Sequence, residues 1–248
     1  MPSSDQDMPL LAHLTELRQR LLRCVLAIAL VFAGLLPFSQ TLYGLVSAPL
    51  RAYLPAGASM IATGVASPFT TPFRLTLWLA LFLGIPLVLH QLWGFIAPGL
   101  YRQEKRLVLP LLLSSVLLFY AGMAFAYVVV FPLMFQFFAS SAPQDVAMMT
   151  DINSYLDFIL TLFFAFGAAF EIPVATVLLI RAGLVDIATL KRSRPYVIVG
   201  CFVAGMLLTP PDVFSQTLLA VPMCLLFEAG LLFGRLLPPR SGQPEARP

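Results

Sequence analysis

The sequence predicts an all-α integral membrane protein with six transmembrane helices and with both termini in the cytoplasm. Of its 248 residues, 59% are hydrophobic and 11% are charged, and the mean hydropathy is +0.89. Soluble domains carry about 25% charged residues, so the composition excludes an ordinary soluble protein. Six apolar runs approach or exceed the length of about 20 residues that a helix needs to cross a bilayer.

The predicted spans follow these runs, at about residues 21–38, 73–96, 107–131, 155–180, 195–208 and 213–233. The fifth is short, because a helix from Tyr196 to Leu208 rises only about 20 Å against a bilayer core of about 30 Å. We expect the bilayer to thin there, or polar residues at the helix ends to complete the span. Residues 1–237 are predicted to form a single membrane domain, and the Pro/Gly/Arg-rich residues 238–248 a disordered cytoplasmic tail.

Basic residues distinguish the two predicted faces of the membrane domain. The outer side holds only Arg51 and Arg74. By the positive-inside rule the opposite side, with both termini, is cytoplasmic. No small-residue cleavage site follows the first apolar run, so we expect an uncleaved first span. The basic residues on the predicted cytoplasmic side are Arg18, Arg20, Arg23, Arg102, Lys105, Arg106, Arg181, Lys191, Arg192, Arg194, Arg235, Arg240 and Arg247.

Short helices on the membrane surface are predicted in the outer connection of residues 39–72. This connection contains Pro49, Pro55, Pro68 and Pro72, which interrupt long regular elements. Its stretches AYL, MIAT and SPF are too apolar for a plain linker. We therefore expect these stretches to rest against the bilayer.

Glu171 is the one carboxylate inside the apolar run of residues 158–180. A charge at that depth costs about 2.5–3.5 kcal/mol, and such residues normally face protein or water and serve a function. The other interpretation is a neutral, hydrogen-bonded glutamic acid that only supports the structure. Thr209 and Gln216 flank the turn between the last two spans and could lie near it.

Two further carboxylates, Glu16 and Glu104, stand on the predicted cytoplasmic face. Glu16 lies in an amphipathic helix before the first span, where its simplest role is a surface pair with Arg20 worth about 0.3–0.5 kcal/mol. The simplest role of Glu104 is to complement the dipole at the start of the third span. On an otherwise basic face, the two could instead bind a ligand that carries guanidinium groups.

Several function classes lack their motifs. The sequence has no GxxxxGK[ST], HExxH or GxSxG motif, only two histidines, and three cysteines without CxxC spacing. We therefore expect no enzyme activity, no cofactor, no metal and no nucleic-acid partner. A proton-coupled secondary transporter that uses Glu171 as a relay is the alternative function, although the repeats and paired broken helices of transporters are not evident.

Eight segments resemble those of one family: HLTELRQRL, SAPL, VASPF, FIAPGLYRQEKR, FYAGMAFAYVVVFP, FAFGAAFEIP, RPYVIVG and GMLLTPPDVFSQTLLAVPM. Together they resemble TatC, the polytopic subunit of the twin-arginine protein translocase, from about residue 10 to about residue 236. The resemblance implies a bacterial cytoplasmic (inner) membrane protein that recognises twin-arginine signal peptides on folded cargo. It also implies self-association, and assembly with the single-span subunits TatA and TatB for export driven by the proton-motive force.

The same resemblance assigns roles to individual residues. Glu16, Arg18, Phe95 and Glu104 match the signal-peptide site on the cytoplasmic face. The intramembrane and outer-loop matches are Glu171 with its polar companions Thr209 and Gln216, the TatB-contact residues Met206 and Leu207, and the outer-loop assembly residues Pro49, Ser67 and Pro68.

Overall fold

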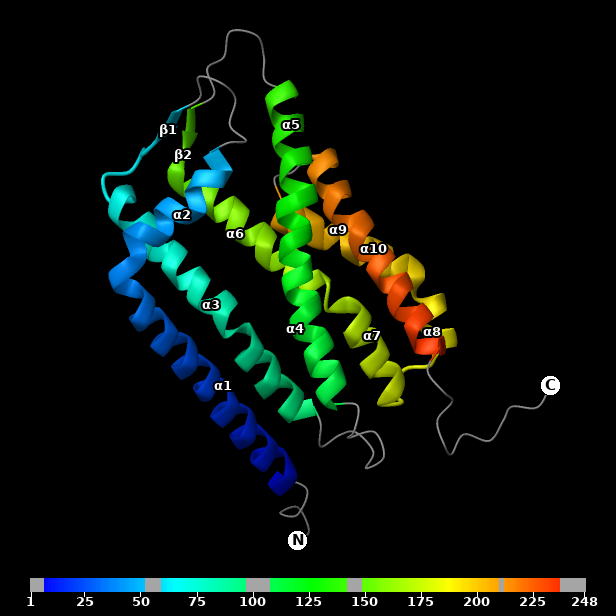
Figure 1. Ribbon diagram of the computed structural model, residues 1–248. Helices are drawn as coiled ribbons and strands as arrows, with labels where there is room; N and C mark the ends of the chain where they lie inside the picture. The colour runs from blue at the N-terminus through cyan, green and yellow to red at the C-terminus, as the bar shows by residue number, and fades with distance from the viewer. Residues whose placement is uncertain (1–6, 52–58, 97–107, 142–148, 210–211, 237–248) are drawn as a thin grey trace, which may run out of the picture. The chain divides into compact units, whose positions relative to one another are not determined.

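The computed structural model describes residues 7–51, 59–96, 108–141, 149–209 and 212–236 (Figure 1). Helices dominate it, as predicted. Its elements in chain order are α1 (Asp7–Leu35), the 3₁₀ turn η1 (Leu36–Phe38), α2 (Ser39–Arg51), β1 (Ser59–Ile61), α3 (Ser67–Ile96), α4 (Val108–Phe125), the π-helical turn η4 (Ala126–Val130), α5 (Phe131–Ser141), β2 (Met149–Asp151), α6 (Ile152–Ala169), α7 (Ile172–Arg181), α8 (Ile187–Arg192), α9 (Arg194–Leu208) and α10 (Val213–Leu236).

Five helical stretches are long and apolar enough to cross a membrane: Leu14–Val46, Ser67–Phe95, Leu109–Phe138, Ile152–Arg181 and Val213–Leu236. The fifth predicted span, residues 195–208, corresponds to α9, which has 15 residues and rises about 22 Å. The prediction of a short fifth apolar helix is thus confirmed. The length and composition of the helices indicate a multi-pass membrane protein. The orientation of the termini stays a prediction.

The predicted fourth span, residues 155–180, is not one helix but two. The chain turns at Phe170 and Glu171, between the end of α6 and the start of α7. Pro173 explains the break, because it has no N–H to donate and its ring clashes with the carbonyl oxygen four residues earlier. It is accommodated instead within the first two residues of α7, where no intrahelical donor is needed.

The first outer connection also differs from the prediction. The stretch MIAT was expected to be helical, but its first two residues belong to β1, which pairs in parallel with β2. Met60 lies opposite Thr150, and Ile61 opposite Asp151. Helix α2 does form in this connection, whereas residues 52–58 lie outside the described part of the chain. The placement of α2 on the membrane surface stays a prediction.

Asp151 joins the two sides of this small sheet. Its Oδ1 accepts hydrogen bonds from the Thr63 hydroxyl at 2.8 Å and the Thr63 N–H at 3.1 Å. Its Oδ2 accepts from the N–H and hydroxyl of Ser154 at 3.1 and 3.0 Å. Hydrogen bonds to the charged form, led by that of the Ser154 N–H, lower the pKa of the carboxyl below its ordinary value. The carboxylate thereby ties the start of α6 to the segment before α3.

The chain divides into two compact units, the first made of Met1–Pro98 and Pro132–Leu160. In it α1 and α2 pack against α3, and α1 runs alongside α3 in Figure 1. The buried side of α3 includes Leu75, Phe82 and Trp93, while most of α1 stays exposed, as suits a lipid-facing helix. The prediction of a single membrane domain over residues 1–237 stays untested.

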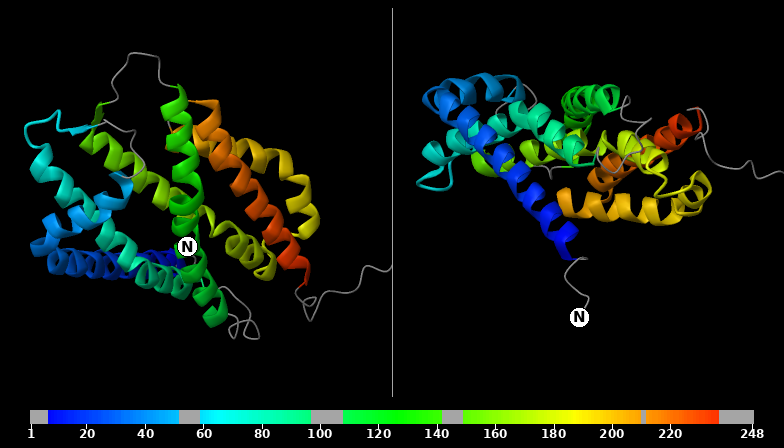
Figure 2. Two further views of the ribbon diagram at one scale, coloured as in Figure 1. Left: turned by 45° about the horizontal axis from the view of Figure 1, so that its top comes forward. Right: turned by 90° about the horizontal axis from the view of Figure 1, so that it is seen from below.

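The second unit consists of Gly99–Phe131 and Thr161–Pro248. Helix α10 packs against α7, α8 and α9, and α9 lies beside α10 in Figure 2. The core of this unit is aromatic and aliphatic, with Phe119, Phe166 and Leu231 almost fully buried. This packing positions the α6–α7 break, which carries Glu171.

Candidate functional site

Glu16 is paired with Arg20 one turn further along α1. The Glu16 Oε1 atom accepts hydrogen bonds from Arg20 Nη2 at 2.6 Å and from Arg20 Nε at 3.0 Å. The side chains are 39% and 22% exposed, so the pair is partly shielded from solvent. The predicted surface pair between these residues is therefore confirmed.

Helix α3 holds the guanidinium of this pair. Arg20 Nη1 donates to the carbonyl oxygen of Gln91 at 3.4 Å. A Cβ atom at Gly94 would come within 2.4 Å of the same nitrogen, so a larger residue there would require the guanidinium to shift. Arg20 thus links Glu16 on α1 to the end of α3. Sequence reasoning missed this role of Gly94, since its signal, a glycine two residues before the end of α3, is weak.

The other predicted members of the signal-peptide site are Arg18, Phe95 and Glu104. Arg18 is exposed on α1. Phe95 is half-buried on α3, next to Gly94. Glu104 lies outside the described residues. The structure therefore brings Glu16 to the end of α3 that carries Phe95, and the role of Glu104 stays a prediction.

Glu171 occupies the turn between α6 and α7 with a half-buried side chain. The Ser115 hydroxyl of α4 forms a hydrogen bond with its carboxyl group. The Oε1 atom of Glu171, however, is buried and has no hydrogen-bond partner among the described residues. Ser115 was missed from the sequence, although a serine pair inside an apolar span is a visible signal.

Thr209 and Gln216 each form a hydrogen bond to a backbone carbonyl of α9, at the junction of α9 and α10. The Thr209 hydroxyl donates to the carbonyl oxygen of Gly205 at 2.8 Å, and Gln216 Nε2 donates to that of Phe202 at 2.9 Å. Gly205 also lets α10 approach, because a Cβ atom there would lie 3.1 Å from Gln216 Cγ. In the described part of the chain no hydrogen bond joins Thr209 or Gln216 to Glu171. Their proximity to it stays a prediction.

The predicted partner-contact residues Met206 and Leu207 are 54% and 75% exposed on α9. In the outer connection, Ser67 is buried and its hydroxyl accepts a 2.5 Å hydrogen bond from Asn153 Nδ2. Pro68 is exposed at the start of α3. Pro49 lies within α2, but its side chain is outside the described residues. Ser67 therefore connects α3 to α6, while α9 presents an apolar surface.

No group of three or more His, Cys, Asp or Glu residues in the described ranges could hold a metal ion. The three cysteines are free thiols. The polar features of the described structure include the Glu16–Arg20 pair, Glu171 with Ser115, and the junction of α9 with α10. All three are suited to binding rather than to covalent chemistry.

Comparison with known proteins adds the family. The family described as "Sec-independent protein translocase protein (TatC)" matches residues 12–222. A protein of that name from Azotobacter chroococcum mcd 1 is 74% identical over 233 residues, which cover 94% of this chain and 91% of that protein. The one from Escherichia coli K12 is 58% identical over 233 residues, covering 94% and 90%. A crystal structure of the twin-arginine translocase receptor TatC is similar with a TM-score of 0.81, at 34% identity, over 90% of this chain and 98% of that one.

Proposed function

This chain belongs to the TatC family of Sec-independent protein translocase proteins, and we propose that it is the receptor subunit for twin-arginine signal peptides. As a member of that family it is a translocase component and not an enzyme. The signal peptides of folded cargo would bind at the cytoplasmic face of the bacterial inner membrane.

The observation that carries this proposal is that Glu16 already binds a guanidinium. Two N–H groups of Arg20 meet one carboxylate oxygen, and no described hydrogen bond uses Glu16 Oε2. Arginine offers several donors in a fixed planar arrangement, whereas lysine is a compact point charge. A carboxylate fixed in this way is suited to bind the arginine of an incoming peptide through its second oxygen, or in exchange for Arg20.

The proposed scaffold role rests on the second unit. Glu171 Oε1 is buried without a described partner, which fits a hydrogen bond from a polar side chain of a docking helix. Exposed Met206 and Leu207 offer an apolar face for a single-span subunit. The partners we propose are TatA and TatB, with transport driven by the proton-motive force and with several copies of this chain in the complex. The short α9 is suited to a locally thinned bilayer.

Peptide binding by the purified protein tests the receptor proposal. We expect a twin-arginine signal peptide to bind more tightly than its twin-lysine version. Glu16→Gln should lower the affinity for the twin-arginine peptide by about 10- to 150-fold, because hydrogen bonds to a charged group contribute about 1.5–3 kcal/mol. Glu104→Gln should also lower the affinity for the twin-arginine peptide.

Glu228→Gln is the matched control for Glu16→Gln. Glu228 also pairs with an arginine, since its Oε2 accepts from Arg194 Nη2 at 2.6 Å, and its side chain is 47% exposed. Its substitution should leave peptide binding unchanged. Equal affinity for both peptides in all forms would reduce Glu16 to a structural charge and refute the proposed site.

Arg20→Gln should narrow the preference for arginine over lysine. Without the Arg20 guanidinium, the Glu16 carboxylate is neither neutralised nor fixed, so it attracts any cation. The pair is partly exposed, and its removal should improve twin-lysine binding by up to about fivefold, with a smaller gain for twin-arginine. The same titration measures this, with Arg194→Gln as the control. Unchanged selectivity would mean that Arg20 does not position Glu16.

A further inference from the structure

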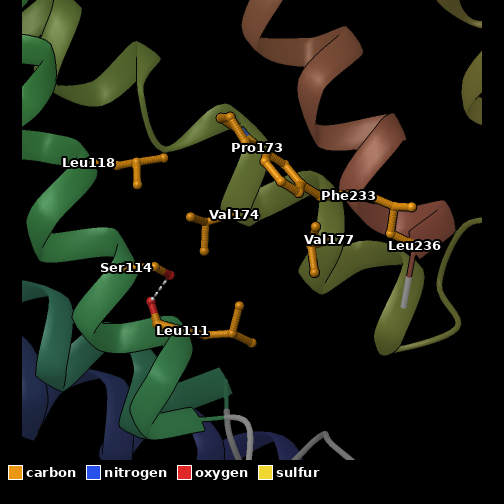
Figure 3. Close-up of a pocket in the computed structure, with 8 residues that line it drawn as sticks. All are labelled: Leu111, Ser114, Leu118, Pro173, Val174, Val177, Phe233 and Leu236. Carbon is orange, nitrogen blue, oxygen red and sulfur yellow. Dashed lines mark hydrogen bonds between the residues drawn. The ribbon is translucent and has the colours of Figure 1, made fainter. Parts of the chain in front are cut away.

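An apolar pocket of about 340 Å³ lies between α4, α7 and α10 (Figure 3). Leu111 and Leu118 line it from α4, Val174 and Val177 from α7, and Leu236 from α10. In Figure 3 the side chains of Leu118 and Val174 point into the space between α4 and α7. Small-molecule sites usually measure about 300–1,000 Å³, so the pocket is large enough to hold an elongated apolar group.

The pocket offers no unsatisfied polar side chain to an occupant. Ser114 is the one polar residue among those that line it. Its hydroxyl donates a 2.8 Å hydrogen bond to the carbonyl oxygen of Leu111, drawn as the dashed line in Figure 3. An ordered water needs two to four polar partners, and this wall does not supply them. The occupant is therefore apolar, and in a bilayer the apolar group at hand is a lipid tail.

Two arginines lie close to lining residues in the sequence, at one end of the pocket. Arg181 ends α7 and lies four residues after Val177, which places it on the same helix face one turn further along. Arg235 is exposed in the last turn of α10 and immediately precedes Leu236. Leu111 lies in the first turn of α4, so that helix begins at the same end. The distribution of basic residues predicts that this end faces the cytoplasm.

We propose that the pocket binds an anionic phospholipid of the cytoplasmic leaflet. One acyl chain would lie between α4, α7 and α10, with the head-group phosphate at Arg181 and Arg235. Lipid tails are as apolar as the pocket wall, so occupation by a chain does not by itself select one lipid. The arginines supply the selection, because basic sites between transmembrane helices on the cytoplasmic side bind anionic head groups. This site is independent of the proposed signal-peptide site.

A simpler role for the two arginines has to be separated from this one. Arginines at the cytoplasmic ends of helices follow the positive-inside rule and complement the helix dipole. That role alone predicts neither a preference among lipids nor any dependence on the volume of the pocket. The experiment therefore changes the charge and the volume separately.

Titration of two lipids into the delipidated full-length protein in detergent, followed by native mass spectrometry, tests the proposal. Dioleoyl phosphatidylglycerol should occupy one site more than tenfold more tightly than dioleoyl phosphatidylcholine. Arg181→Gln and Arg235→Gln should each lower the affinity for phosphatidylglycerol by about fivefold. The Leu236 side chain is 73% exposed, so this position tolerates a larger ring. Leu236→Trp should fill the open end of the pocket and lower the affinity of this site for both lipids.

Two matched variants test the location of the site. Leu117→Trp adds the same ring at a residue of α4 that is 68% exposed and does not line the pocket. Arg192→Gln removes an exposed arginine from the last turn of α8. Both should leave the tight site intact. Equal affinity for the two lipids, or the same losses in these control variants, would overturn the proposal.

Discussion

Gly122→Ala is expected to lower the free energy of unfolding by about 1–3 kcal/mol, and Gly122→Leu to prevent accumulation of folded protein. A Cβ atom at Gly122 of α4 would lie 2.4 Å from the carbonyl oxygen and 2.8 Å from the carbonyl carbon of Phe166 in α6. These are backbone atoms, which cannot rotate away as the end of a side chain can. Even one added carbon must therefore push the two helices apart.

The close approach at Gly122 is matched from the other helix. A Cβ atom at Gly167 would come within 2.7 Å of the Phe119 ring, so each helix provides a glycine where the other comes near. Small residues of this kind let helices pack closely inside a membrane, where the hydrophobic effect does not drive them together. The separation of α4 from α6 would also disturb the Phe125–Phe166 contact, whose ring centroids are 5.6 Å apart.

Gly200→Ala is the control for this prediction. Gly200 also lies in a helix, α9, but a Cβ atom there would meet nothing within 4 Å. Alanine is the better helix former by about 0.5–1 kcal/mol, so this variant should be as stable as the wild type or slightly more so. Thermal unfolding in detergent measures all the variants. Equal shifts at Gly122 and Gly200 would show that helix propensity, and not the contact with Phe166, governs stability.

Local patterns in the sequence were sufficient to predict most helices. The apolar runs predicted their extents because a helix in lipid must be almost entirely apolar over its length. The short α9 was visible for the same reason. The Glu16–Arg20 pair followed from the i,i+4 spacing on one helix face. Each of these predictions depends only on residues close together in the chain.

The features that were missed depend on distant residues or on backbone proximity. The pairing of β1 with β2 joins Ser59–Ile61 to Met149–Asp151, which no local pattern connects. The close approach of the Arg20 guanidinium to Gly94 depends on the packing of α1 against α3, which no local pattern predicts. The helix break at Glu171, in contrast, has a local signal in the sequence, because Pro173 lies two residues after it. The long apolar run concealed it, since prolines are tolerated in membrane helices more often than in soluble ones.

Glu171→Leu is expected to weaken assembly with single-span partner subunits by about 3- to 20-fold while leaving the isolated protein folded. Interhelical hydrogen bonds in a membrane contribute about 0.6–1.7 kcal/mol, which sets this range. The carboxyl Oε1 atom is buried without a described partner, so when leucine replaces Glu171 the isolated protein loses the hydrogen bond with Ser115 but no described bond at Oε1. The proposed docking helix, in contrast, would lose the acceptor for its polar side chain.

Glu171→Gln separates hydrogen bonding from the transfer of protons. The amide keeps one acceptor oxygen and two donors but cannot carry a proton, so it should retain most of the assembly. Ser115→Ala removes only the internal partner of the carboxyl group and should also leave assembly near that of the wild type. Co-purification with the partner subunits and thermal unfolding of the isolated protein measure the two effects. If Glu171→Leu lowered the unfolding temperature as strongly as it reduced assembly, the glutamate would be a structural group. A Glu171→Gln variant that assembles fully but does not transport would instead assign the carboxyl group to proton transfer.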